Sequence, residues 1–163
     1  MERVRVADLP TLDDRCAGIR TLTEALGSTD VALNHFELEP SESPALGLHA
    51  HPDQEEVFHV LEGAVTFECT GTDPEGEAES VRVAAGETVR FAPGEYQRAW
   101  NHEDETAELL AIGAPQSTES ADVRGDCPAC ERRTRTAVEA TDDELVCRCA
   151  DCGAVTRRVE RFG

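Results

Sequence analysis

The chain has 163 residues, a length that allows one full domain and a second small one. Its 34 acidic residues outnumber 15 basic ones, and every basic residue is an arginine, because the sequence contains no lysine. No apolar run approaches the roughly 18 residues that a membrane span needs, and nothing resembles a signal peptide, so we expect a soluble cytoplasmic protein without a membrane partner.

The charge is large and unevenly distributed. Residues 1–123 hold 26 acids and 7 arginines, whereas residues 124–163 hold eight of each, which indicates two domains. A strong net charge destabilises a folded chain by self-repulsion, and concentrated salt screens that repulsion because the Debye length falls to about 3 Å at 1 M. The composition therefore resembles that of a halophilic protein. The alternative is an ordinary acidic protein from a genome that prefers arginine codons.

Residues 1–30 have the least readable pattern. Residues 21–26 fit either a helical turn or part of a strand hairpin, and we expect the segment to pack on the domain that follows. From residue 31 onward, short β-branched and apolar runs alternate with turn signals, a cadence typical of an antiparallel sandwich or barrel. The predicted strands cover residues 31–38, 46–50, 56–61, 64–69, 81–84, 88–91, 96–101 and 107–112.

Two histidines two residues apart suggest a metal site. His49 and His51 leave the same face of a strand, and the turn residues after them allow a hairpin that brings Glu56 back beside them. Two imidazoles and one carboxylate suit Fe, Mn, Ni, Co or Zn with positions left open for a ligand. The alternative is a solvated polar turn on a barrel rim.

The same residues resemble the first motif of the cupin superfamily, HxH(x)3,4E(x)6G, and Gly63 completes it at the right spacing. Residues 86–101 supply the frame of the second cupin motif, with Gln97 where the family places its last metal-binding histidine. Ala92 and Ser43 depart from the family's proline and glycine. Gln97 either coordinates the metal, holds a metal-bound water, or marks a weakened site. The resemblance implies an all-β fold, a cupin jelly-roll barrel over residues 31–116, and a homodimer.

Two CxxC pairs near the C-terminus predict a structural zinc site. Cys127 and Cys130 are separated by 18 residues from Cys149 and Cys152, and four thiolates complete a tetrahedral shell. About 40 residues bury too little apolar surface to fold without such a metal. We therefore expect a linker over residues 117–124 and a zinc ribbon over 125–163, with strands at 134–138, 145–149 and 155–159. Two disulfides are the alternative.

The remaining cysteines and histidines carry no ligand spacing. Cys147 lies two residues from Cys149 and either faces away or competes as a ligand, whereas Cys16 and Cys69 are interpreted as buried apolar residues. We expect His59 to point outward. We expect Tyr96 and Trp100 to pack on the face of their strand opposite Gln97.

Two functions fit these features. The first is a metal-dependent small-molecule enzyme, resembling cupin dioxygenases and isomerases; the second is a metabolite- or metal-sensing module that signals through its ribbon. A nucleic-acid partner is disfavoured, because the ribbon's charges cancel and the acidic barrel would repel phosphate. The residues expected to shape the ligand pocket are the inward-facing Phe58, Phe67, Phe91 and Ala99.

Overall fold

The computed structural model describes residues 1–11, 17–141 and 144–160, and it is built almost entirely of β-strands. In these residues no helix is long and apolar enough to cross a membrane. In chain order the elements are η1 (Val6–Asp8), β1 (Gly18–Thr21), α1 (Leu22–Leu26), β2 (Ala32–Leu38), β3 (Leu48–Ala50), β4 (Glu55–Glu62), β5 (Ala64–Gly71), β6 (Glu79–Ala84), β7 (Thr88–Phe91), β8 (Tyr96–Trp100), β9 (Ala107–Ala114), β10 (Asp122–Cys127), β11 (Arg132–Ala140), β12 (Glu144–Cys149) and β13 (Val155–Glu160).

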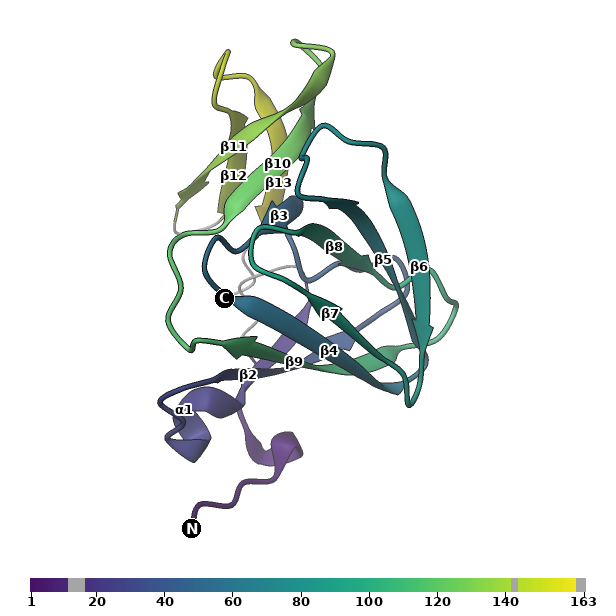
Figure 1. The fold of residues 1–163 in the computed structure, drawn as a ribbon, viewed down its shortest axis with the longest axis vertical. Helices are drawn as coiled ribbons and strands as arrows, with labels where there is room; N and C mark the ends of the chain where they lie inside the picture. The colour runs from purple at the N-terminus through teal and green to yellow at the C-terminus, as the bar shows by residue number, and fades with distance from the viewer. Residues whose placement is uncertain (12–16, 142–143, 161–163) are drawn as a thin grey trace.

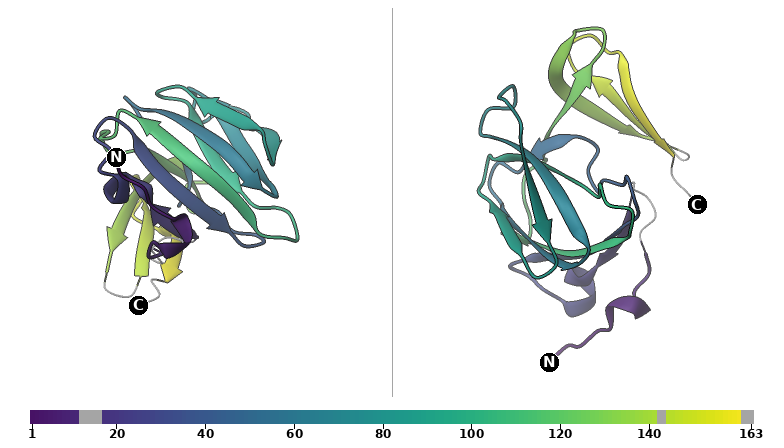
Figure 2. Two further views of the ribbon diagram at one scale, coloured as in Figure 1. Left: turned by 90° about the horizontal axis from the view of Figure 1, so that it is seen from below. Right: turned by 90° about the vertical axis from the view of Figure 1, so that its right-hand side faces the viewer.

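Two antiparallel sheets form the molecule. One has the order β1-β2-β9-β4-β7, and the other has the order β13-β12-β11-β10-β3-β8-β5-β6. Figure 1 shows the barrel below and β10 to β13 rising above it, and Figure 2 shows these four strands extending from one side of the barrel. This arrangement confirms the predicted all-β cupin jelly-roll fold.

The core of the barrel lies between the two sheets. Alternate residues of β4 and β9 point into it, as the period of two predicts. Three phenylalanines, Phe58, Phe67 and Phe91, contact one another in this core. The rings of Phe58 and Phe67 lie 5.0 Å apart between centroids, and those of Phe67 and Phe91 lie 5.5 Å apart. Ala99 belongs to the same cluster. Turns at Gly63, Gly86 and Gly94, all with positive φ, connect the strands where the sequence placed turns.

The N-terminal segment joins the first sheet. β1 pairs with β2 from Gly18 opposite Glu37 to Thr21 opposite Asn34, and a helical turn, α1, follows at once. Gly27, in the left-handed conformation, ends that turn. Of the two alternatives for residues 21–26, the helical turn is therefore the one observed, apart from Thr21, which ends β1. Cys16 lies outside the described residues.

Strand β10 differs from the sequence prediction. Residues 122–124, expected to belong to a linker, pair with β3 in the register of Asp122 with Ala50 and Val123 with His49. The physical reason is that β3 would otherwise leave one edge of backbone groups without partners. Because β10 continues into the pairing with β11, the ribbon and the barrel share one sheet.

Candidate metal centres

Three elements bring the predicted barrel ligands together. His49 lies within β3, where its neighbours Leu48 and Ala50 are buried on the opposite face, and His51 follows the strand directly. Glu56 lies near the start of β4 on the same face as the core residues Phe58 and Val60. The ligand atoms of the two histidines and the glutamate all lie within 4.8 Å of one another.

Gln97 occupies the middle of this group. Its position on β8 pairs directly with His49 on β3. Its Nε2 donates to Glu56 Oε2 at 3.0 Å and lies 3.2 Å from His49 Nε2. Its Oε1 is buried and has no hydrogen-bond partner among the described residues. The side chain predicted to replace the fourth ligand is thus in contact with two of the other three.

The hydrogen bonds of His49 fix its tautomer. Its Nδ1 lies 3.3 Å from the carbonyl oxygen of Gly47, which can only accept, so Nδ1 carries the proton. Nε2 is then left with its lone pair, accepting from Gln97. A backbone carbonyl that orients a histidine in this way is common at metal sites, because it aims the free nitrogen at the ion.

Burial sets the charge of the group. Desolvation lowers the pKa of His49 to about 4, with help from the neighbouring His51, and desolvation also lowers the pKa of His51. Desolvation raises the pKa of Glu56 to about 7, against the opposing hydrogen bond from Gln97. Both imidazoles are therefore neutral near pH 7, which is the form that binds a metal ion, and a cation beside Glu56 would favour its charged form. His51 Nε2 lies 3.7 Å from Glu56 Oε2.

These residues fit a divalent ion. One nitrogen of each imidazole and one carboxylate oxygen match the preferences of first-row metals. The buried Gln97 Oε1 also has no hydrogen-bond partner among the described residues. A polar atom buried without a hydrogen bond is costly, so an ion or its water would remove a penalty that the protein alone leaves in place.

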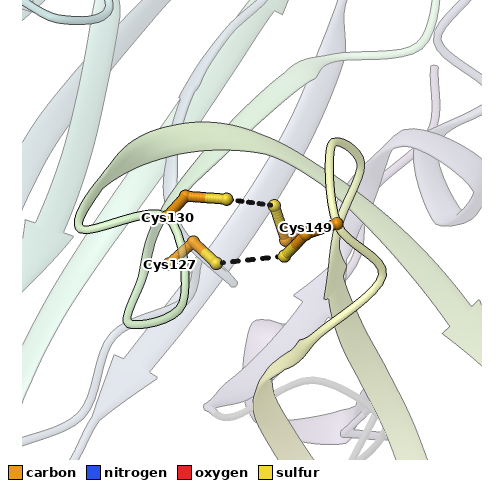
Figure 3. A group of neighbouring side chains, drawn as sticks. Cys127, Cys130 and Cys149 are labelled. Atoms are coloured by element: carbon orange, nitrogen blue, oxygen red, sulfur yellow. Dashed lines mark hydrogen bonds between the residues drawn. The ribbon is translucent and has the colours of Figure 1, made fainter.

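The four cysteines of the C-terminal region form a second cluster. The sulfur atoms of Cys127, Cys130, Cys149 and Cys152 lie within 4.8 Å of one another, and Figure 3 shows Cys127 and Cys130 on one loop facing Cys149 on another. Two of the sulfur–sulfur distances are 3.6 and 3.9 Å. Four thiolates bound to zinc at about 2.3 Å would lie about 3.8 Å apart, so the cluster has the dimensions of a tetrahedral zinc site.

The thiols of this cluster influence one another. Thr134 Oγ1 donates to Cys149 Sγ at 3.3 Å and lowers the pKa of Cys149 to about 6. The sulfur of Cys152 raises the pKa of Cys130 to about 12. Cys147 is buried but is not a member of the group of four, which resolves its predicted ambiguity in favour of a packing role. Cys69 is half-buried in the barrel.

Other predicted residues have ordinary structural roles. His59 is half-buried beside Thr88 Oγ1, at 2.9 Å. Trp100 stacks on His102 and lies under the guanidinium of Arg98, so it packs as expected. Tyr96 is buried, as its predicted packing role requires. Its hydroxyl also donates a hydrogen bond to Asp122 Oδ2 at 2.6 Å, which links β8 to β10 and was not predicted.

A pocket of about 630 Å³ opens beside the barrel site and reaches His49 and His51. The expectation that Phe58, Phe67, Phe91 and Ala99 shape the pocket is wrong, because these side chains fill the core and do not line it. Its walls come instead from β1, β2, the loop before β3, and the ribbon. Sequence reasoning missed the ribbon wall because no local pattern records a contact between distant segments. Residues 138, 140 and 145 of the ribbon make that wall, together with residues 121 and 123 at the start of β10.

Comparison with known proteins agrees with this fold. Residues 34–113 match the family described as the cupin domain. Among curated proteins, none matches the chain. Many solved structures are similar. One is a recombinant oxalate oxidase in complex with glycolate, with a TM-score of 0.59 and 19% sequence identity over 72% of this chain and 60% of that one.

Bacillus subtilis oxalate decarboxylase, a protein with Mn(II) centres, is also similar. One of its structures has a TM-score of 0.60 and 17% identity over 73% of this chain and 31% of that one. Another, determined at pH 4.6, has a TM-score of 0.59 and 18% identity over 73% and 30%. The chain thus spans 60% of the oxidase and less than a third of the decarboxylase. At these identities the likeness shows a shared fold.

Proposed function

Because residues 34–113 form a cupin domain, we propose that this protein is a metal-dependent enzyme acting on a small molecule, of the dioxygenase or isomerase type. The observation that carries the proposal is the group of His49, His51 and Glu56, whose ligand atoms converge within 4.8 Å beside a pocket of about 630 Å³. A convergent polar group at the end of a pocket of this size is the usual form of a small-molecule site.

Each residue has a defined part in this proposal. His49, His51 and Glu56 would hold a divalent ion, and a bound ion supplies Lewis-acid or redox chemistry. Gly47 keeps the proton of His49 on Nδ1, and Gln97 links His49 to Glu56 and holds the two side chains together. The likeness to a fold that carries Mn(II) in the decarboxylase makes manganese the first ion to test, followed by Fe, Ni, Co and Zn.

For the ribbon we propose a structural zinc ion held by Cys127, Cys130, Cys149 and Cys152. The two ligand sets predict two metals of unlike behaviour, because four thiolates retain zinc tightly whereas a nitrogen and oxygen site exchanges its ion. We expect elemental analysis of freshly purified protein to find about two metal ions per chain. Dialysis against a mild chelator should then leave one zinc. One metal or none in the fresh protein would contradict the two-site proposal.

The test of the enzyme proposal compares neighbouring glutamates on β4. We expect protein loaded with each candidate ion to convert a component of a small-metabolite pool, and Glu56→Ala to abolish this turnover. Glu55→Ala is the matched control, because Glu55 leaves the opposite face of the strand and pairs with Arg90 at 2.6 Å. That variant should retain turnover. A protein in which no ion supports conversion or oxygen consumption is not this enzyme.

A second candidate is a sensor, and the pairing of Val123 with His49 favours it. A ligand at the barrel site would act directly on β10, the strand that continues into the ribbon. In this case the protein binds a ligand saturably without converting it, and hydrogen exchange changes in residues 125–160. Conversion that Glu56→Ala eliminates would exclude the sensor as the whole function.

A further inference from the structure

The pocket beside the barrel site is built from two distant parts of the chain. On the barrel side it is lined by Ile19 and Phe36, which pair with each other across β1 and β2. On the other side it is lined by Val138, Ala140 and Leu145, from the ends of β11 and β12. The zinc ribbon therefore forms one wall of a cavity that reaches the two histidines.

Several contacts hold this wall against the barrel. The backbones of β3 and β10 pair at Leu48 and Arg124. Arg157 Nη1 donates to the carbonyl oxygens of Ala45 and Leu46 at 3.3 and 3.2 Å, in the loop that also lines the pocket. Arg133 Nη1, on β11, donates to the carbonyl oxygen of Pro74, between β5 and β6, at 3.0 Å. These contacts join the ribbon to three parts of the barrel: strand β3, the loop before β3, and the loop between β5 and β6.

The chemistry of the lining defines a class of ligand. Among the described residues around the pocket, no side chain is charged, and polar side chains come from Thr21, Asn34 and the two histidines. A carboxylate or phosphate away from the ion would find no cationic side chain among the described lining residues, and burying a charge without a partner is costly. An apolar group would instead cover Val138, which is 41% exposed on an otherwise strongly charged surface.

We propose that the ribbon is the ligand-selecting wall of this protein, and that the ligand is an uncharged, largely apolar small molecule with one metal-binding head group. The inference rests on the proposed function for the head group, which needs an ion at His49, His51 and Glu56. The apolar wall is inferred from the residues that line the cavity, independently of any ion. The two parts can therefore be tested separately with one ligand series.

The test uses alkyl hydroxamates from two to eight carbons, titrated by calorimetry into full-length protein loaded with Mn(II), and into the same protein after chelation. The hydroxamate head binds metal, and the chain reports on the wall. We expect acetohydroxamate to bind only the loaded protein. Affinity should rise about fourfold for each added methylene until the pocket is filled, the gain expected from burying a methylene.

Variants of the ribbon locate the effect. Val138→Asp should reduce the gain to less than about twofold per methylene while leaving acetohydroxamate binding unchanged, because a carboxylate at the wall opposes apolar contact. Val138→Leu should preserve the gain. Val155→Asp is the matched control: Val155 is a similarly exposed valine of β13 that does not line the pocket, and its variant should behave as the wild type. Circular dichroism verifies that each variant folds.

The outcomes separate the two proposals. If acetohydroxamate binds the loaded protein but longer chains bind no more tightly, or if Val138→Asp leaves the gain intact, the ribbon wall is overturned and the metal site stands. If long chains bind equally with and without Mn(II) and acetohydroxamate does not bind, the wall is supported and the proposed metal chemistry fails.

Discussion

At the scale of single residues, Gln97 is where this site departs from the cupin motif. A neutral amide stands between His49 and Glu56, and it donates to both from the same nitrogen. This arrangement holds the imidazole and the carboxylate close together. Gln97 Oε1 is buried without a partner among the described residues, so the hydrogen-bonding groups of this amide are only partly satisfied.

We therefore predict that Gln97→His tightens metal binding in the barrel by about tenfold or more, because imidazole is a better ligand than an amide for ions of this type. Competition with a chromophoric chelator measures the affinity. Gln116→His, in the loop between β9 and β10, adds a histidine without touching the site and should change nothing. Equal affinities for the wild type and Gln97→His would place residue 97 outside the coordination shell.

The positions of the barrel residues could be predicted because local rules determine them. Alternation along a strand places His49 and His51 on one face, and a hairpin returns Glu56 to them. The pocket could not be predicted in the same way. Phe58 and Phe91 face inward as expected, but whether inward residues pack on one another or leave a space depends on the whole barrel.

At the scale of elements, β10 connects the barrel to the ribbon, the two parts that were predicted from the sequence to be separate domains. It pairs with β3 on one edge and β11 on the other, and it ends at Cys127 of the proposed zinc site. Its residues Asp122, Arg124 and Asp126 gave no apolar alternation, so no strand was expected there. The strand exists because the free edge of β3 needs backbone partners, which is a tertiary requirement.

Because β10 belongs to both the barrel and the ribbon, a change in the ribbon is expected to affect part of the barrel. Cys130→Ser should release the zinc and unfold β11 to β13, because a segment of this size has little apolar core of its own. Since β10 also pairs with β3, we expect faster hydrogen exchange at residues 48–50, while β4, β5 and β9 remain protected. Native-state exchange followed by mass spectrometry measures all of these regions together.

The matched control for that experiment is Cys147→Ser. Cys147 is buried in β12, two residues from Cys149, but lies outside the four-sulfur cluster. The variant should keep its zinc and the protection of the ribbon, with at most a modest loss of stability. Protection that persists in Cys130→Ser, or zinc that is lost from Cys147→Ser, would contradict the assignment of the four ligands.

At the scale of the whole molecule, the acidic surface is only weakly compensated. The arginines of the barrel do pair with carboxylates, as Arg82 does with Glu103 at 2.7 Å. Exposed pairs of this kind are worth less than about 1 kcal/mol each. With 26 acids and 7 arginines in residues 1–123, most acids have no arginine to neutralise them. Self-repulsion therefore opposes folding of the barrel far more than of the ribbon, whose charges balance.

We predict that the melting temperature rises by several degrees or more between dilute buffer and 2 M NaCl, because salt shortens the range of this repulsion to a few ångströms. The double variant Asp73→Asn/Glu77→Gln, in the loop between β5 and β6, removes two charges from a part of the barrel that carries many. It should melt at a higher temperature than the wild type in dilute buffer and gain less from salt. Asp126→Asn/Asp151→Asn, in the charge-balanced ribbon, should reduce the gain by less, because it removes no repulsion among the barrel's acids. A melting temperature that is the same in dilute and molar salt would show that the acidic surface is not an adaptation to salt.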